Sequence, residues 1–223
     1  MSFYETLIKA TEAEKNNLFT LDVIQASLHG DISLDLYVAF LQQAFHHVKH
    51  TVPLLMRCGS RLTESQEWLR VAIAEYIEEE SGHQEWVLND IAACGYNKEQ
   101  ARVSVPNFAT EMMVSYAYDS IDRVSPLAFF GMVLVLEGTS TQLATKAAGV
   151  IQASLNLPNS AFSYLTSHGE LDLEHVKFYE GLMNQITDPA EQAVIIHAAK
   201  NFYKLYANVF SELAESQAQV LKQ

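Results

Sequence analysis

The chain has 223 residues, a hydrophobic content of 49% and a formal net charge of −13. This length and apolar content suit one globular domain with a sizeable core, so we expect residues 1–223 to form a single domain. The acidic balance argues against binding of nucleic acid, whose phosphates require a surplus of lysine and arginine. It also argues against a basic membrane-binding surface.

The expected location is the cytoplasm. The two cysteines, Cys58 and Cys94, form neither a metal-ligand motif nor a disulfide framework, which fits a reducing compartment. The first five residues lack the positive and apolar regions of a signal peptide. The longest apolar stretch, Pro126–Leu136, is shorter than the roughly 20 residues that a membrane-spanning helix needs.

The sequence predicts helices separated by short breaks, because no segment shows sustained alternation of β-branched residues. The fold class that this predicts is all-α, a single compact bundle of about seven helices. In chain order, the expected helices cover residues 3–29, 33–58, 63–94, 106–123, 126–155, 160–186 and 190–222.

Several residues mark where these helices begin, bend or end. Ser33 is placed to cap the second helix, and the capping-box pattern Thr63–Gln66 opens the third. Pro53 should kink the second helix, and Gly95 is a natural residue to follow the end of the third. A loop with a short helical turn should follow Gly95.

The segment around His168 carries the strongest chemical signal. On a helix His168, Asp172 and His175 stand at i, i+4 and i+7, and therefore share one stripe. Apolar neighbours such as Leu171 and Val176 suggest that this stripe points inward, although a surface helix with two stray histidines is the ordinary alternative. Mixed imidazole and carboxylate ligands at helical spacing suit a non-haem iron or manganese site.

Two further acidic positions strengthen this interpretation. Glu137 ends a strongly apolar run, where a metal carboxylate explains a charged side chain better than a satisfied core carboxylate does. Gly131 and Gly138 on the same helix are expected to allow close approach of backbone, metal or substrate. Glu80 and His83 stand at i, i+3 on one predicted helix face, and Glu79 remains an alternative to Glu80 within this acidic run.

A cluster of three histidines, His46, His47 and His50, precedes Pro53 at spacings of one helical turn. No acidic residue accompanies them, so core histidines that bond to neighbours explain them as well as a functional role does. We treat His47 and His50 as substrate-pocket candidates, together with Tyr116 from among the tyrosines.

On these motifs the chain resembles the haem-oxygenase-like superfamily, which includes TenA-type thiaminases and the pyrroloquinoline-quinone synthase, and it is most similar to the non-haem di-iron oxidases. The resemblance covers nearly the full length. It implies that two metals are bound by three carboxylates and three histidines, and that the protein forms a homodimer. One metal would take Glu80, His83 and part of Glu137, and the other would take Glu137, His168, Asp172 and His175.

Departures from the other branches narrow the resemblance. The apolar helix from Gly131 to Gly138 contains no cysteine, so thiamin hydrolysis by a cysteine nucleophile is not expected. Residues 3–25 contain no histidine that could bind haem from the first helix. Only one Glu-x-x-His pair is present, whereas the ferritin pattern has two.

The expected function is that of a metal-dependent oxidase or oxygenase that activates O2 and acts on a small organic molecule. Two irons are the expected cofactor, with manganese or a mixed iron–manganese pair also compatible with these ligands. One alternative is a cofactorless oxidase similar to the quinone synthase. The other is a non-enzymatic protein that binds a small molecule.

Overall fold

Helices make up the fold. The computed structural model describes residues 1–220, and the side chains of residues 1–166 and 175–216. Residues 1–220 contain α-helices and short helical turns but no strand, which confirms the all-α prediction. The α-helices are α1 Phe3–Phe19, α2 Asp22–His29, α3 Leu34–Val48, α4 Thr51–Arg61, α5 Glu67–Glu80, α6 His83–Ala93, α7 Lys98–Arg102, α8 Phe108–Asp119, α9 Phe129–Leu155, α10 Ser163–Met183 and α11 Pro189–Val220.

The expected number of about seven helices is wrong, because residues 1–220 form eleven. Three of the expected long helices each divide into two, at 20–21, 49–50 and 81–82, and the short turn expected after Gly95 is α7. Long apolar periodicity therefore located the helical stretches, but it did not reveal the breaks inside them.

The break between α3 and α4 has an identifiable cause in Pro53. A proline ring clashes with the carbonyl group four residues earlier, which here belongs to Lys49. Helix α3 ends at Val48, and α4 begins at Thr51. The expected kink is thus a complete break, and it leaves His50 between the two helices rather than on a shared face with His46 and His47.

The predicted helix ends are largely confirmed. Ser33 Oγ accepts a hydrogen bond from Leu36 N at 3.1 Å. Both bonds of the capping box between Thr63 and Gln66 are present, although they enclose a short 3₁₀ turn that precedes α5. Gly95 has a φ of +87°, in the left-handed region that favours glycine.

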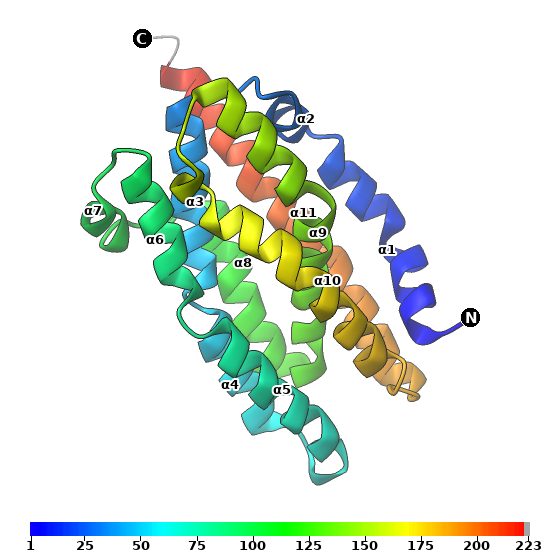
Figure 1. Ribbon diagram of the computed structural model, residues 1–223. Coiled ribbons are helices and arrows are strands. Elements are labelled where there is room, and N and C mark those ends of the chain that lie inside the picture. Colours follow the sequence, from blue (N-terminus) through cyan, green and yellow to red (C-terminus); the bar gives the residue numbers. More distant parts are fainter. Residues whose placement is uncertain (221–223) are drawn as a thin grey trace.

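Helix α9 lies at the centre of the bundle and packs against α10, α11 and α2 (Figure 1). Gly131 permits the contact with α11, because a Cβ atom there would lie 2.5 Å from Ala199 N and 2.9 Å from the carbonyl carbon of Ala198. This is the close backbone approach expected at Gly131. At Gly138, in contrast, an added Cβ would meet nothing within 4 Å.

The segment Pro126–Leu155 is long and apolar enough to cross a membrane by length and composition alone. However, 61% of its most apolar window is buried inside the protein, as is usual for the core helix of a bundle. The segment is therefore weak evidence for a membrane span.

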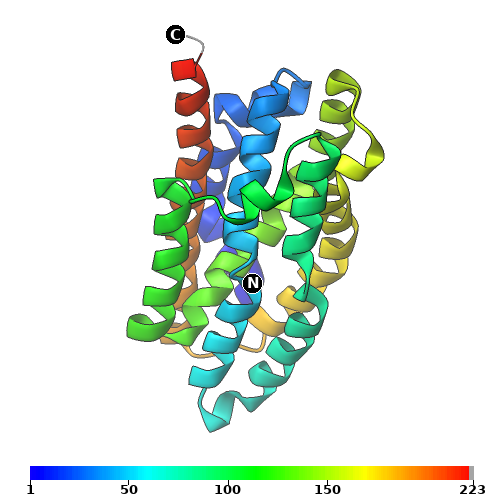
Figure 2. The same ribbon diagram turned by 90° about the vertical axis from the view of Figure 1, so that its left-hand side faces the viewer.

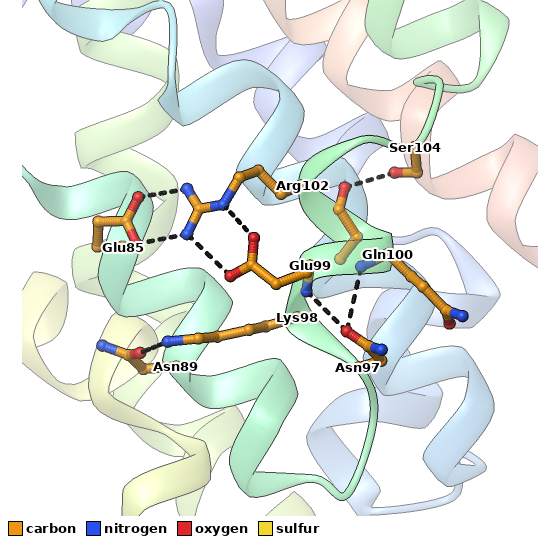
Figure 3. A network of polar contacts seen from close by, with 9 residues as sticks. Glu85, Asn89, Asn97, Lys98, Glu99, Gln100, Arg102 and Ser104 are labelled. Atoms are coloured by element: carbon orange, nitrogen blue, oxygen red, sulfur yellow. Dashed lines mark hydrogen bonds and ion pairs between the residues drawn. The ribbon is translucent and has the colours of Figure 1, made fainter.

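Different helices form the two ends of the molecule (Figures 1 and 2). The turn between α4 and α5 lies at one end, while α2 and the final turns of α9 and α11 lie at the other. Near that second end, α7 is tied to α6 by surface polar contacts (Figure 3). Arg102 donates to both carboxylate oxygens of Glu85 at 2.6 and 2.9 Å, and Lys98 donates to Asn89 Oδ1 at 3.0 Å. These contacts hold α7 against α6, the helix that begins with His83.

Candidate metal centre and substrate cavity

Glu80 and His83 meet across a helix break rather than along one helix. Helix α5 ends at Glu80, and α6 begins at His83. Gly82 lies between them with a φ of +99°, a conformation that residues with a Cβ rarely adopt. The expected i, i+3 helical geometry is therefore wrong, yet His83 Nδ1 still lies 3.0 Å from Glu80 Oε2.

The side chains of this pair are well shielded. His83 is buried, and its ring stacks on Trp86 with centroids 4.0 Å apart and an interplanar angle of 29°. The Glu80 side chain is 11% exposed and lines the main cavity, described below. The imidazole orientation is thus fixed from two directions, by a carboxylate and by an indole.

His175 brings two more acidic residues together. Its Nε2 atom lies 2.9 Å from Glu79 Oε2, and its Nδ1 atom lies 3.9 Å from Glu137 Oε1. The three residues come from α5, α9 and α10. His175 is buried, whereas the Glu79 side chain is 53% exposed. The two candidates of the acidic run, Glu79 and Glu80, therefore approach different imidazoles.

His168 and Asp172 lie outside the residues whose side chains the structure describes. The backbone of α10 is helical throughout Ser163–Met183, so both residues share a helix with His175 at the expected spacing. Among the described side chains, no three from His, Cys, Asp and Glu form a group that could hold a metal ion.

Two cavities meet at Glu137. The main cavity has a volume of about 160 Å³ and is mostly apolar; Glu80, Glu137, Tyr76 and His47 belong to its wall. A second cavity, of about 230 Å³, lies against the neighbouring side of α9, where Glu137 and Gly138 face Tyr4 and Lys15 of α1. Glu137 therefore borders two separate spaces in the bundle.

Tyr76 and Thr139 were missed by the sequence analysis. Tyr76 lies one turn before Glu79 and Glu80 on α5, and its ring packs against His175 with centroids 5.8 Å apart. Burial raises the pKa of Tyr76, and the negative charges of Glu137, Glu80 and Glu79 raise it further, so its hydroxyl stays protonated. The i, i+3 and i+4 spacing to the acidic run was the available signal for Tyr76, whereas nothing in the sequence distinguished Thr139.

Asp90 is a further carboxylate that sequence reasoning missed. It is fully buried and accepts hydrogen bonds from Ser163 N at 3.0 Å, from Tyr164 N at 2.8 Å and from the Ser163 hydroxyl. It thereby caps the first turn of α10. Burial raises the pKa of Asp90, while these hydrogen bonds oppose the rise. Its role is to position the helix that carries His175.

The histidine cluster divides into separate environments. His47 lines the main cavity, whereas His50 and Tyr116 are not among its lining residues. His50 Nδ1 lies 3.1 Å from Tyr118 Oη, and Tyr116 Oη accepts a hydrogen bond from Asn201 at 2.9 Å. His46 is buried and bonds to Ser104 and Lys49. His47 is thus the member of this cluster that reaches the main cavity.

Comparison with known families identifies the chain. The model of a family described as iron-containing redox enzymes matches residues 38–207. The chain belongs to that family. No curated protein matches it in sequence.

Solved structures agree in fold. A domain of unknown function with a haem-oxygenase-like fold from Shewanella denitrificans has a TM-score of 0.88 at 19% identity, and the match covers 100% of this chain and 96% of that one. A TenA homologue from Pseudomonas syringae gives 0.81 at 12% identity, covering 96% and 93%. The haem-bound haem oxygenase-1 of Synechocystis gives 0.77 at 12% identity, covering 100% and 96%. These likenesses confirm the haem-oxygenase-like fold.

Proposed function

We propose that the protein is a non-haem di-iron oxidase or oxygenase that activates O2 and acts on a small organic molecule. The observation that carries this proposal is the approach of Glu79, Glu137 and His175 from three helices, beside the Glu80–His83 pair. Buried charged groups are costly unless they are paired or bind a metal. Membership of the iron-containing redox enzymes supports iron as the metal.

The donor set fits a metal of this kind. Glu80, His83, Glu137 and His175 supply the mixed carboxylate and imidazole ligands that iron or manganese accepts. We propose that His168 and Asp172 complete the set from the same helix as His175. When bound, two reduced irons supply the electrons that reduce dioxygen.

The surrounding residues position these ligands. Glu79 accepts from Nε2 of His175 and turns its Nδ1 atom toward Glu137. A carboxylate that fixes the tautomer and orientation of a ligating histidine is a recurring feature of metal sites. Glu79 is therefore proposed as the partner that orients His175, with Glu80 as the ligand.

The main cavity provides the place for the substrate. Its mostly apolar wall surrounds the space beside Glu80 and Glu137, and apolar surroundings strengthen electrostatic interactions. The Tyr76 hydroxyl is held protonated at this wall and can donate a hydrogen bond. A homodimer without nucleic-acid or membrane partners is part of the same proposal.

The test is anaerobic loading with Fe(II), followed by mixing with O2 while visible absorption is recorded. We expect about two irons per chain, as in other two-metal sites, and a transient absorption band after mixing. The variants His175→Ala and Asp172→Ala should each bind less iron. No iron uptake, with an unchanged spectrum, would contradict the proposal and favour a cofactorless oxidase or a binding protein.

A further inference from the structure

The main cavity is long and slender. Its wall follows α9 from Phe129 to Ile151, a distance of roughly 33 Å at 1.5 Å per residue. Its volume of about 160 Å³ is small for that length. A narrow cross-section therefore favours an extended molecule over a compact one.

The longer arm of the cavity runs from the level of Glu137 past Leu143 and Ala147 to Ile151 on α9. The helices α2, α9 and α11 form the end of the molecule in this direction (Figures 1 and 2). The wall of this arm is formed mainly by aliphatic side chains, among them Val23, Leu28, Ile32, Leu143, Ala147 and Ile151. Such a wall gives an apolar chain favourable contact and offers little to a polar one.

Three hydroxyl groups along the main cavity already have partners in the protein. Ser27 donates to Val23 O at 2.7 Å, and Ser140 donates to Glu137 O at 2.8 Å. The Tyr37 hydroxyl donates to Ala161 O at 2.8 Å. These groups therefore require no hydrogen bond from a bound molecule.

Two hydroxyls near Glu137 differ from these. Tyr76 Oη and Thr139 Oγ1 are buried, line the main cavity and have no hydrogen-bond partner among the described residues. A buried hydroxyl without a partner is destabilising, and most such groups in proteins are bonded. Tyr76 lies one turn before Glu80 on α5, so a polar group bonded to its hydroxyl would be close to the proposed metal ligands. Thr139, two residues beyond Glu137 on α9, does not face Glu137 around the helix.

We propose that the main cavity binds an elongated aliphatic molecule whose oxygen-bearing end accepts a hydrogen bond from Tyr76 beside Glu80 and Glu137, with its chain in the longer arm. This inference rests on the proposed function and names the class of substrate. It places the polar end of the molecule, and the carbon atoms next to it, at the site of oxidation.

The test uses the metal-free protein, so that it does not depend on iron. Binding of 1-decanol is compared with binding of 1-adamantanemethanol, a compact alcohol of similar carbon content, by isothermal titration calorimetry and by the shift in melting temperature. We expect 1-decanol to bind at least about tenfold more tightly, which corresponds to 1.4 kcal/mol. Equal binding of the two alcohols, or binding of neither, would overturn the proposal.

Substitutions at two matched alanines test where the aliphatic chain of the bound molecule lies. Ala147 lines the longer arm, whereas Ala153 is exposed on the same helix. Ala147→Phe should fill the arm and weaken binding of 1-decanol by at least about tenfold, while Ala153→Phe should leave the affinity unchanged. An unchanged affinity for 1-decanol in Ala147→Phe would contradict the placement of its aliphatic chain in the longer arm.

Two matched tyrosines locate the polar end. Tyr76→Phe removes an unpartnered hydroxyl, so it should weaken binding of 1-decanol by about three- to tenfold and raise the melting temperature of the free protein. Tyr179→Phe removes a hydroxyl that donates to Phe130 O at 2.7 Å and that does not line the main cavity, so it should lower the melting temperature and leave the affinity unchanged. Equal affinities in Tyr76→Phe and the wild type would exclude the assigned orientation.

The outcomes distinguish this inference from the proposed function. Iron uptake without selective binding of 1-decanol would overturn the substrate class and retain the di-iron site. Selective binding without iron uptake would support the cavity assignment and contradict the di-iron site.

Discussion

Two acidic regions of this bundle provide their carboxylates with different kinds of partner. Asp90 is fully buried, and its oxygens accept hydrogen bonds from two backbone amides and a hydroxyl at the start of α10. Glu80 and Glu137 are partly buried, lie near imidazoles and form part of the wall of a cavity. Two of the three partners of Asp90 are backbone amides, whereas the partners of the glutamates are side chains suited to metal binding.

This difference in partners indicates that Asp90 has a structural role, whereas Glu80 and Glu137 have functional roles. A carboxylate that caps a helix stabilises the fold, and removing it leaves backbone donors without partners. A carboxylate kept beside imidazoles at a cavity wall is expected to contribute little to stability in the absence of metal. Stability and iron binding should therefore respond to different substitutions.

The largest effect on stability is expected at Asp90. Asp90→Ala leaves Ser163 N and Tyr164 N unsatisfied and should lower the free energy of unfolding by about 3 kcal/mol, measured by urea denaturation at pH 7. Asp90→Asn should cost less, because an amide oxygen can still accept a hydrogen bond. The raised pKa of Asp90 means that its charged form is disfavoured in the fold, so its contribution to stability falls as pH rises through that pKa. Equal losses in both variants would contradict this role.

The second effect on stability depends on pH and concerns His46, which, like Asp90, is buried and bonded to other residues. Burial first, and then the charges of Lys49 and His50, lower its pKa from 6.5 to about 4. The neutral form is favoured in the fold, so this contribution to stability is complete above pH 6.5 and is lost as pH falls toward 4. A loss on the order of 2 kcal/mol is expected between pH 7 and pH 4.5.

The check on His46 is urea denaturation across this pH range. His46→Gln should flatten the pH dependence of stability between pH 6.5 and pH 4. The pKa of His50 is also lowered, by burial first and then by Lys49, so His50→Gln serves as the parallel variant that measures its separate share. An unchanged pH profile in His46→Gln would show that His46 does not carry the effect.

The glycines of α9 give a smaller effect. Gly138→Ala should raise the free energy of unfolding by about 1 kcal/mol, because alanine favours the helix and the added Cβ meets nothing within 4 Å. Gly131→Ala is the matched variant and should destabilise, because its Cβ would clash with the backbone of Ala198 and Ala199. Thermal unfolding of the two variants measures the contrast, and the same sign in both would contradict it.

The smallest effect on stability is expected at Glu80. Glu80→Gln keeps a hydrogen-bonding side chain beside His83 and should change the free energy of unfolding of the metal-free protein by less than about 1 kcal/mol. The same substitution should reduce iron uptake. A loss of stability as large as that in Asp90→Ala would remove the distinction between the two acidic regions.

Much of the fold could be predicted from the sequence. Apolar periodicity located the helical stretches, and local capping chemistry at Ser33, Thr63–Gln66 and Gly95 located several of their ends. The break at Lys49–His50 follows from Pro53, but predicting it required the geometry of the clash rather than the presence of a proline. The break at Gly82 was hidden because Glu80 and His83 also fit an uninterrupted helix.

The site was less accessible to sequence reasoning. The segments containing Glu80, Glu137 and His175 stood out because charged residues interrupt apolar patterns. The role of Asp90 depends on its meeting with Ser163, 73 residues later, and no local pattern reveals such a contact. The unpartnered hydroxyls of Tyr76 and Thr139 likewise emerge only from the packing around them.

The most direct test compares iron bound per chain in the wild type, Glu137→Gln and Asp90→Asn after anaerobic Fe(II) loading and removal of free metal. Circular dichroism first establishes that each variant is folded. The proposed di-iron site predicts about two irons in the wild type and in Asp90→Asn, and fewer in Glu137→Gln. Equal iron content in Glu137→Gln and the wild type, or no iron in any of the three, would contradict a metal centre built around Glu137.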